Sequence, residues 1–148
     1  MHASTTHEFY NIHNIIRYMT LSELTQQYKP TDVLGNTDIV ISGIELDSRK
    51  CKPGTAFVAI RGTQTDGHTY IEKAISLGAN CIICETLPQN TDPNVTYAIY
   101  SNTAEIVGPL ATTFYGNPTK RMKLVGITGT NGKTTIATTL YNIIRRMG

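Results

Sequence analysis

Hydrophobic positions in this chain fall into short runs separated by polar loops that contain Gly and Pro. Runs rich in apolar and β-branched residues predict strands over residues 38–47, 56–60, 81–84 and 95–99. Gly78 is expected to end a helix of about two turns, and Asn102 to cap another helix that runs to Tyr115. Because a strand, the helix before Gly78 and a further strand follow in close succession, they form a predicted βαβ unit. The pattern is that of an α/β protein.

A capping box marks the first helix. Thr20 and Glu23 have the spacing at which each side chain accepts a hydrogen bond from the other residue's backbone N–H, and this helix is expected to end near Pro30. Residues 52–54 predict a turn between the first two strands. Residues 1–18 show no clear periodicity, and the sequence leaves the role of this N-terminal extension open.

A domain boundary is expected where Gly116 and Pro118 end the helix that starts at Asn102. Beyond a short basic link, the sequence predicts a strand over residues 124–128 and a helix over residues 133–147. A lone apolar strand needs sheet neighbours and covering helices, which about 30 residues cannot supply. The chain is therefore predicted to be a fragment that ends within a truncated second domain. The predicted segments are an extension (1–18), an α/β domain (19–118) and the start of the second domain (119–148).

Charge is nearly balanced. The 148 residues include 13 Lys and Arg against 11 Asp and Glu, a formal net charge of +2. So small an excess argues against nucleic acid or an anionic membrane surface as a partner. No apolar run approaches the roughly 18 residues of a membrane span, and the first residues lack the basic and apolar regions of a signal peptide. We therefore expect a cytoplasmic protein without a membrane or nucleic-acid partner.

Three cysteines are too few for a disulfide framework, so reduced thiols are expected. Cys81 and Cys84 have the spacing of a redox or zinc half-site. They lie in an apolar run, however, where residues three apart on a strand face opposite sides of the sheet. No second Cys/His pair is placed to complete a tetrahedral site. A buried strand is therefore favoured over metal binding or redox chemistry.

A glycine-rich segment between the last predicted strand and helix carries the strongest chemical signal, Gly126-Ile-Thr-Gly-Thr-Asn-Gly-Lys-Thr-Thr135. Glycines let backbone N–H groups point at phosphate oxygens, and the helix N-terminus adds partial positive charge. Lys133 would reach the β- and γ-phosphates of ATP, and the Thr134 hydroxyl would hold Mg²⁺. The strict pattern has a glycine where Ile127 stands here. The alternative is a glycine-rich turn with a surface lysine.

The variant of this loop resembles the nucleotide loop of the Mur ligase superfamily, a group of ATP-dependent amide-forming enzymes. Leu46-Asp-Ser-Arg49, the following Pro53 to Gly62 and Thr65-Asp-Gly-His68 are similar to the N-terminal UDP-binding domain of the muramyl-peptide ligases. Phe114-Tyr-Gly-Asn-Pro118 resembles the branch that forms the tripeptide more than the branch that acts next. The resemblance covers residues 20–148.

The resemblance implies a parent enzyme of peptidoglycan synthesis that uses ATP and Mg²⁺. It would add meso-diaminopimelate or L-lysine to UDP-N-acetylmuramoyl-L-alanyl-D-glutamate through an acyl phosphate, as a monomer, and the fragment alone would be inactive. Lys133 and Thr134 would be catalytic, with Thr134 on the metal. The ATP-binding residues would be Gly129, Thr130, Asn131, Gly132, Lys133, Thr134 and Thr135. The substrate-binding residues would be Leu46, Ser48, Thr63, Gln64 and Thr65.

Simpler roles remain open for three residues near the substrate motif. Asp47 and Arg49 could pair with each other or cap a turn, and His68 could be a structural hydrogen-bonding residue rather than a base, because no catalytic partner is visible near it. Two other functions also remain open for the whole chain. These are a ligase that acts on the UDP-muramoyl-tripeptide and a UDP-sugar-binding module without catalysis.

Overall fold

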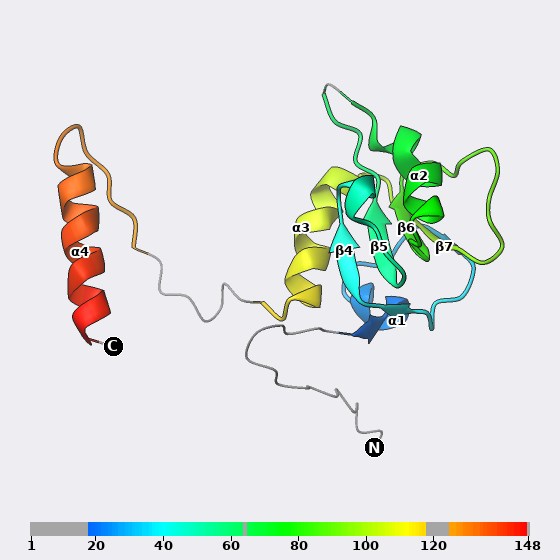
Figure 1. Ribbon diagram of the computed structural model, residues 1–148, viewed down its shortest axis with the longest axis horizontal. Helices are drawn as coiled ribbons and strands as arrows, with labels where there is room; N and C mark the ends of the chain where they lie inside the picture. The colour runs from blue at the N-terminus through cyan, green and yellow to red at the C-terminus, as the bar shows by residue number, and fades with distance from the viewer. Residues whose placement is uncertain (1–17, 64, 118–124, 148) are drawn as a thin grey trace, which may run out of the picture. The chain divides into compact units, whose positions relative to one another are not determined.

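The computed structural model describes residues 18–63, 65–117 and 125–147 (Figure 1). The chain divides into two compact units, Met1–Pro118 and Thr119–Gly148. The first unit contains every strand of the described residues, and the second contains one helix. In the described part of the chain, no helix has the length and apolar character that a membrane crossing requires.

A five-stranded sheet forms the centre of the first unit, with the strand order β2-β7-β6-β5-β4. Its four strands from β4 to β7 run parallel, whereas β2 lies antiparallel to β7 at one edge. The five strands are β2 (Asp32–Leu34), β4 (Gly43–Glu45), β5 (Thr55–Val58), β6 (Cys81–Cys84) and β7 (Thr96–Ile99). A separate antiparallel pair is made of β1 (Met19–Thr20) and β3 (Val40–Ile41).

Helices occupy both faces of this sheet. The α-helices of the first unit are α1 (Leu21–Leu24), α2 (Ile71–Ser76) and α3 (Thr103–Phe114), and two short 3₁₀ helices are η1 (Ser48–Lys50) and η2 (Gly67–Tyr70). Since β5 and β6 pair in parallel and are joined through η2 and α2, the predicted βαβ unit is confirmed. The α/β class predicted from the sequence is confirmed as well.

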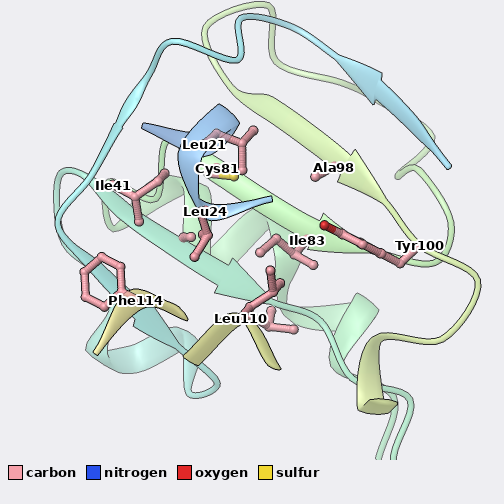
Figure 2. Close-up of a cluster of buried hydrophobic side chains, with 11 residues drawn as sticks. Leu21, Leu24, Ile41, Cys81, Ile83, Ala98, Tyr100, Leu110 and Phe114 are labelled. Atoms are coloured by element: carbon pink, nitrogen blue, oxygen red, sulfur yellow. The ribbon is translucent and has the colours of Figure 1, made fainter. Parts of the chain in front are cut away.

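Alternate residues of the central strands pack on opposite sides of the sheet. Val58 and Ile83 belong to the core on the side covered by α1 and α3. There Ile83 lies with Leu24, Leu110 and Phe114 in the cluster that Figure 2 shows. On the other side, the core is formed with α2 and contains Phe57, Ile82, Tyr97, Ile71 and Ala74. All four residues of β5 and of β6 are buried, because a parallel strand covered on both faces has no solvent side.

The predicted buried strand at Cys81 and Cys84 is confirmed. Burial raises the pKa of Cys81 to about 12 and that of Cys84 to about 11, so both thiols are protonated at neutral pH. Cys51 is also buried, and burial raises its pKa to about 11. Among the described residues, no three His, Cys, Asp or Glu side chains come together as a possible metal site.

Gly78 ends α2, as predicted, with a positive φ of 105°. Its backbone lies against the turn at residues 52–54, so that a Cβ atom built on Gly78 would stand 2.8 Å from the nitrogen of Pro53. The next residue already leads into β6. Two features therefore require glycine at position 78: the left-handed backbone conformation and the close approach of a second backbone segment.

Three predicted elements differ from the structure. The predicted strand over residues 38–47 is broken at Ser42: its first half, β3, pairs with β1, and its second half, β4, joins the main sheet. At the break, the Ser42 backbone N–H donates to Gly54 O (2.8 Å) in the turn that precedes β5. The first helix has the predicted capping box but ends at Leu24 instead of near Pro30. There Thr25 ends the helix, and its backbone N–H and its hydroxyl both donate to Leu21 O (2.9 Å each).

The third difference lies in the second unit. The strand predicted over residues 124–128 is wrong for residues 125–128, which form no strand, while Leu124 lies outside the described residues. A strand needs a neighbour for its backbone groups, and no other strand is present in the described part of this unit. The helix that follows, α4 (Lys133–Met147), is confirmed over the predicted range.

Candidate functional site

A cavity of about 450 Å³ lies where strands β4 and β5 lead into their following loops. We call it the edge cavity, since β4 is the last strand of the sheet. In open parallel sheets, ligands bind beyond the carboxyl ends of the strands. The edge cavity is lined by Leu46, Asp47, Ser48, Arg49, Thr65, Tyr70 and Lys73.

Three of the substrate-binding residues expected from the sequence meet in the edge cavity. Leu46 and Ser48 follow β4 directly, and Thr65 comes from the loop after β5, so that residues from separate segments line the same cavity. Thr63 is exposed and does not line the cavity. Gln64 lies outside the described residues.

Ser48 is the first residue of η1 and is only 5% exposed. Asp47 caps this short helix, because its carboxylate accepts a hydrogen bond from the Arg49 backbone N–H (3.0 Å). The cap fixes the backbone on both sides of Ser48. No other described residue forms a hydrogen bond with the Ser48 hydroxyl, which leaves that hydroxyl free to bond a ligand in the edge cavity.

Asp47 and Arg49 form an ion pair at the cavity wall. Arg49 Nε donates to Asp47 Oδ1 (2.9 Å), and an Arg49 terminal nitrogen donates to Asp47 Oδ2 (2.8 Å). These side-chain bonds, together with the backbone bond from Arg49, lower the pKa of Asp47 to about 2. Both simple alternatives considered for these residues, mutual pairing and capping of a turn, are confirmed.

His68 is held from both sides of its ring. Its Nδ1 lies 2.7 Å from Asp66 Oδ1, and its Nε2 accepts a hydrogen bond from the Glu85 backbone N–H (2.9 Å). Arg61 extends the network through a contact of 3.3 Å with Asp66. The His68 hydrogen bonds lower the pKa of Asp66, with a smaller contribution from the Arg61 charge. The structure thus shows His68 as a hydrogen-bonding residue of the loop that carries Thr65.

Sequence reasoning missed Tyr70 and Lys73, which also line the edge cavity. Tyr70 ends η2, and Lys73 lies in α2. The signal available in the sequence was their spacing, because residues three apart on a helix share one face. With these two, the cavity has an aromatic ring and a second cation beside the predicted hydroxyl groups.

The loop before α4 has the backbone expected of a phosphate-binding segment. Gly129 and Gly132 both have positive φ, 144° and 76°, and α4 begins at the next residue, Lys133. The Ile136 backbone N–H donates to Gly132 O (3.0 Å), which starts the helical ladder. The N–H groups of the preceding residues have no helical acceptor, and they are available to an anion at this helix end.

Lys133 folds back over this loop. Its ammonium donates hydrogen bonds to the carbonyl oxygens of Gly129 and, at 3.4 Å, of Thr130. Thr134 and Thr135 are exposed in the first turn of α4, and Asn131 is exposed in the loop. The loop therefore gathers a cation, hydroxyl groups and backbone donors in ten residues, which fits the charge and oxygen-rich surface of a nucleotide phosphate chain.

Comparisons with known proteins identify the family of this chain. Residues 40–115 match the model of the Mur ligase family, catalytic domain. The chain is 53% identical over 130 residues to a UDP-N-acetylmuramoyl-L-alanyl-D-glutamate--2,6-diaminopimelate ligase of Phocaeicola vulgatus, 50% identical to the ligase of the same name from Bacteroides fragilis and 42% identical to that from Listeria monocytogenes. The aligned segments cover 88% of this chain but only 27%, 27% and 26% of those relatives.

Among solved structures, MurF from Acinetobacter baumannii superposes with a TM-score of 0.52 at 21% identity, covering 66% of this chain and 21% of that one. At this identity the likeness concerns the fold alone. The chain belongs to the Mur ligase family. The three relatives named above are, by name, UDP-N-acetylmuramoyl-L-alanyl-D-glutamate--2,6-diaminopimelate ligases.

Proposed function

We propose that this chain carries the UDP-muramoyl-binding domain and the phosphate loop of an ATP-dependent ligase. Residues 19–118 would form the binding domain, and residues 119–148 would begin the ATP-binding domain. The enzyme would join an amino acid to UDP-N-acetylmuramoyl-L-alanyl-D-glutamate. The observation that carries the proposal is the 53% identity over 130 residues to a ligase whose name states that reaction. The sequence alone left diaminopimelate and lysine open, and the names of the relatives favour 2,6-diaminopimelate.

The edge cavity would hold the UDP end of the substrate. Ser48 supports this role because it lines the edge cavity together with Thr65 and its hydroxyl is bonded to no other described residue. Hydroxyl groups can both donate to phosphate or carbonyl oxygens and accept from the N–H of a uracil. Leu46 and Tyr70 would supply apolar surface for the base.

The loop of residues 126–135 would bind ATP. Phosphoryl transfer to the side-chain carboxylate of the D-Glu residue would give an acyl phosphate, and the incoming amine would displace phosphate to form the amide. Lys133 would leave its carbonyl partners for the phosphate oxygens, where its charge and the loop N–H groups stabilise the negative charge of the transferred group. Mg²⁺ on the Thr134 hydroxyl would neutralise further charge when bound.

Binding and turnover test the two halves of this proposal separately. The isolated chain should bind UDP-N-acetylmuramoyl-L-alanyl-D-glutamate in calorimetry, with a far weaker response to the corresponding sugar-peptide without UDP. For turnover, this chain replaces the matched 130-residue segment of the Phocaeicola vulgatus relative, giving a protein that we call the hybrid ligase. It should release phosphate from ATP only when the UDP-dipeptide and diaminopimelate are both present.

Two other outcomes would point to the alternatives. If the hybrid ligase accepted the UDP-muramoyl-tripeptide and not the dipeptide, the chain would belong to the ligase of the following step. If the isolated chain bound UDP-sugars but the Lys133→Ala hybrid ligase were as active as the unchanged hybrid, the loop would have no role in catalysis, and the chain would supply only a binding module.

A further inference from the structure

The charged side chains that line the edge cavity differ in whether another side chain already pairs with them. Its lining contains one carboxylate, Asp47, and two cations, Arg49 and Lys73. Arg49 directs its Nε and one terminal nitrogen at the two carboxylate oxygens of Asp47, and so compensates that charge. The remaining cation of the cavity is Lys73.

Lys73 lies on the exposed side of α2 and lines the edge cavity together with residues of η1. Its ammonium forms no ion pair and no hydrogen bond with any other described residue, in contrast to Arg61, which contacts both Asp66 and Glu85. The ammonium therefore remains hydrated and ready to exchange water for an anionic oxygen. A lysine at the end of a four-carbon stem can follow a phosphate group within the cavity without a change of backbone.

We propose that Lys73 binds the diphosphate of the UDP group and is thereby a specificity-determining residue of the edge cavity. The inference rests on the proposed function, which supplies UDP as the ligand. The hydroxyl groups of Ser48 and Thr65 are neutral, and a diphosphate bound by them alone would leave its negative charge uncompensated in a partly enclosed site. Lys73, which lines the same cavity from α2, supplies that charge.

Three ligands separate the base from the diphosphate. Uridine carries the base and ribose, UDP adds the diphosphate, and pyrophosphate carries the phosphates alone. Dissociation constants are measured by calorimetry for the unchanged chain, for Lys73→Gln and for Lys73→Arg. Lys52→Gln is the matched control, because Lys52 is an exposed lysine near η1 that does not line the cavity, and its substitution removes the same net charge.

Lys73→Gln should weaken UDP binding by about tenfold, as expected for loss of one charge-assisted hydrogen bond, and leave uridine binding unchanged. Lys73→Arg should keep UDP affinity within about threefold, since the charge is retained. Lys52→Gln should change neither ligand. The dependence of UDP binding on salt concentration should also fall in Lys73→Gln alone, because one fewer charge is screened. All variants should unfold at the same urea concentration as the unchanged chain.

Three outcomes would overturn the inference. Equal UDP affinity in Lys73→Gln and the unchanged chain would show that the diphosphate lies elsewhere, with the proposed function intact. Equal losses for UDP and uridine would assign Lys73 to the shape of the cavity. Binding of pyrophosphate as tightly as UDP, with the same loss in Lys73→Gln, would indicate a general anion site. Failure of the unchanged chain to bind either UDP or uridine would instead refute the edge cavity as the substrate site of the proposed function.

Discussion

The Nε2 atom of His68 accepts a hydrogen bond of 2.9 Å from the backbone N–H of Glu85, 17 residues further along the chain. On the other side of the ring, Nδ1 faces the Asp66 carboxylate at 2.7 Å. A carboxylate can only accept and a backbone N–H can only donate, so in this arrangement Nδ1 donates and Nε2 accepts. The ring thereby ties the loop that carries Thr65 to the end of β6.

Removal of this imidazole should loosen the loop. In His68→Ala, the Glu85 N–H and the Asp66 carboxylate lose a partner in a partly buried place, and the free energy of unfolding should fall by about 1–3 kcal/mol. The affinity for UDP should fall with it. Urea denaturation followed by circular dichroism, together with calorimetry, measures both effects.

His68→Gln is the matched variant, because an amide can donate to Asp66 and accept from Glu85. It should recover part of the stability and of the affinity that His68→Ala loses. If both variants bound UDP as tightly as the unchanged chain, the loop would not depend on His68 for its position.

The ion pair between Asp47 and Arg49 predicts a pH dependence. Asp47 has a pKa of about 2 in the folded chain, against about 3.9 for an unperturbed aspartate. Because the folded value is the lower one, the ionised carboxylate stabilises the native state above about pH 4, and this contribution disappears as the pH falls from about 4 to about 2. A carboxyl-carbon NMR titration of Asp47 should show its midpoint near pH 2.

In Arg49→Gln, the same midpoint should move up towards the unperturbed value, since the side-chain bonds are the largest cause of the shift. An unchanged midpoint in that variant would assign the low pKa to the backbone N–H alone.

Ser48→Ala tests the role of the hydroxyl in the edge cavity. Loss of a hydrogen bond to a charged group of the ligand costs about 1.5–3 kcal/mol, which corresponds to a rise of roughly ten- to hundredfold in the dissociation constant for the UDP-dipeptide. Stability should hardly change, because the hydroxyl is bonded to no other described residue. In the hybrid ligase, the KM for that substrate should rise while the KM for ATP stays constant. A rise in both would assign Ser48 to the fold.

Lys133→Ala should lower kcat of the hybrid ligase by about two to three orders of magnitude, because a positioned cation at the transferred phosphoryl group is lost. Lys133 is exposed, and its hydrogen bonds to the described residues are with carbonyl oxygens of its own loop, so the urea midpoint should stay the same. Arg145→Ala, at the far end of α4, is the control and should keep normal kcat. Near-normal turnover of Lys133→Ala would refute the assignment of the loop.

The two strands at the centre of the sheet, β5 and β6, could be predicted from the sequence because they are largely apolar runs. β5 and β6 are buried on both faces, and burial of that kind requires an unbroken apolar stretch. The edge strand β2 was missed, since only Val33 of its three residues is even half-buried and no pattern remains to be seen. The break at Ser42 depends on a partner from another turn, which no local pattern reveals.

The candidate site divides in the same way. Ser48 and Thr65 lie in motifs that a resemblance can identify, whereas Lys73 became a member of the cavity only when α2 packed beside η1. The unusual backbone conformation of Gly132 is typical of a glycine in a phosphate loop before a helix. The contact of the Lys133 ammonium with the loop carbonyls could not be predicted from the sequence, because the side-chain conformation depends on acceptors that only the folded loop brings together.

The close approach of Gly78 to Pro53 constrains which residues relatives of this chain can have at these two positions. Since a Cβ atom at position 78 would collide with the proline backbone, a relative can replace this glycine only if its turn at residues 52–54 has shifted or shortened. In an alignment of many family members, substitutions at position 78 should therefore occur together with changes at residues 52–54. The segments that line the edge cavity, η1 and α2, shortly precede Pro53 and Gly78. Such paired changes would therefore alter the width of the cavity between relatives without altering the sheet.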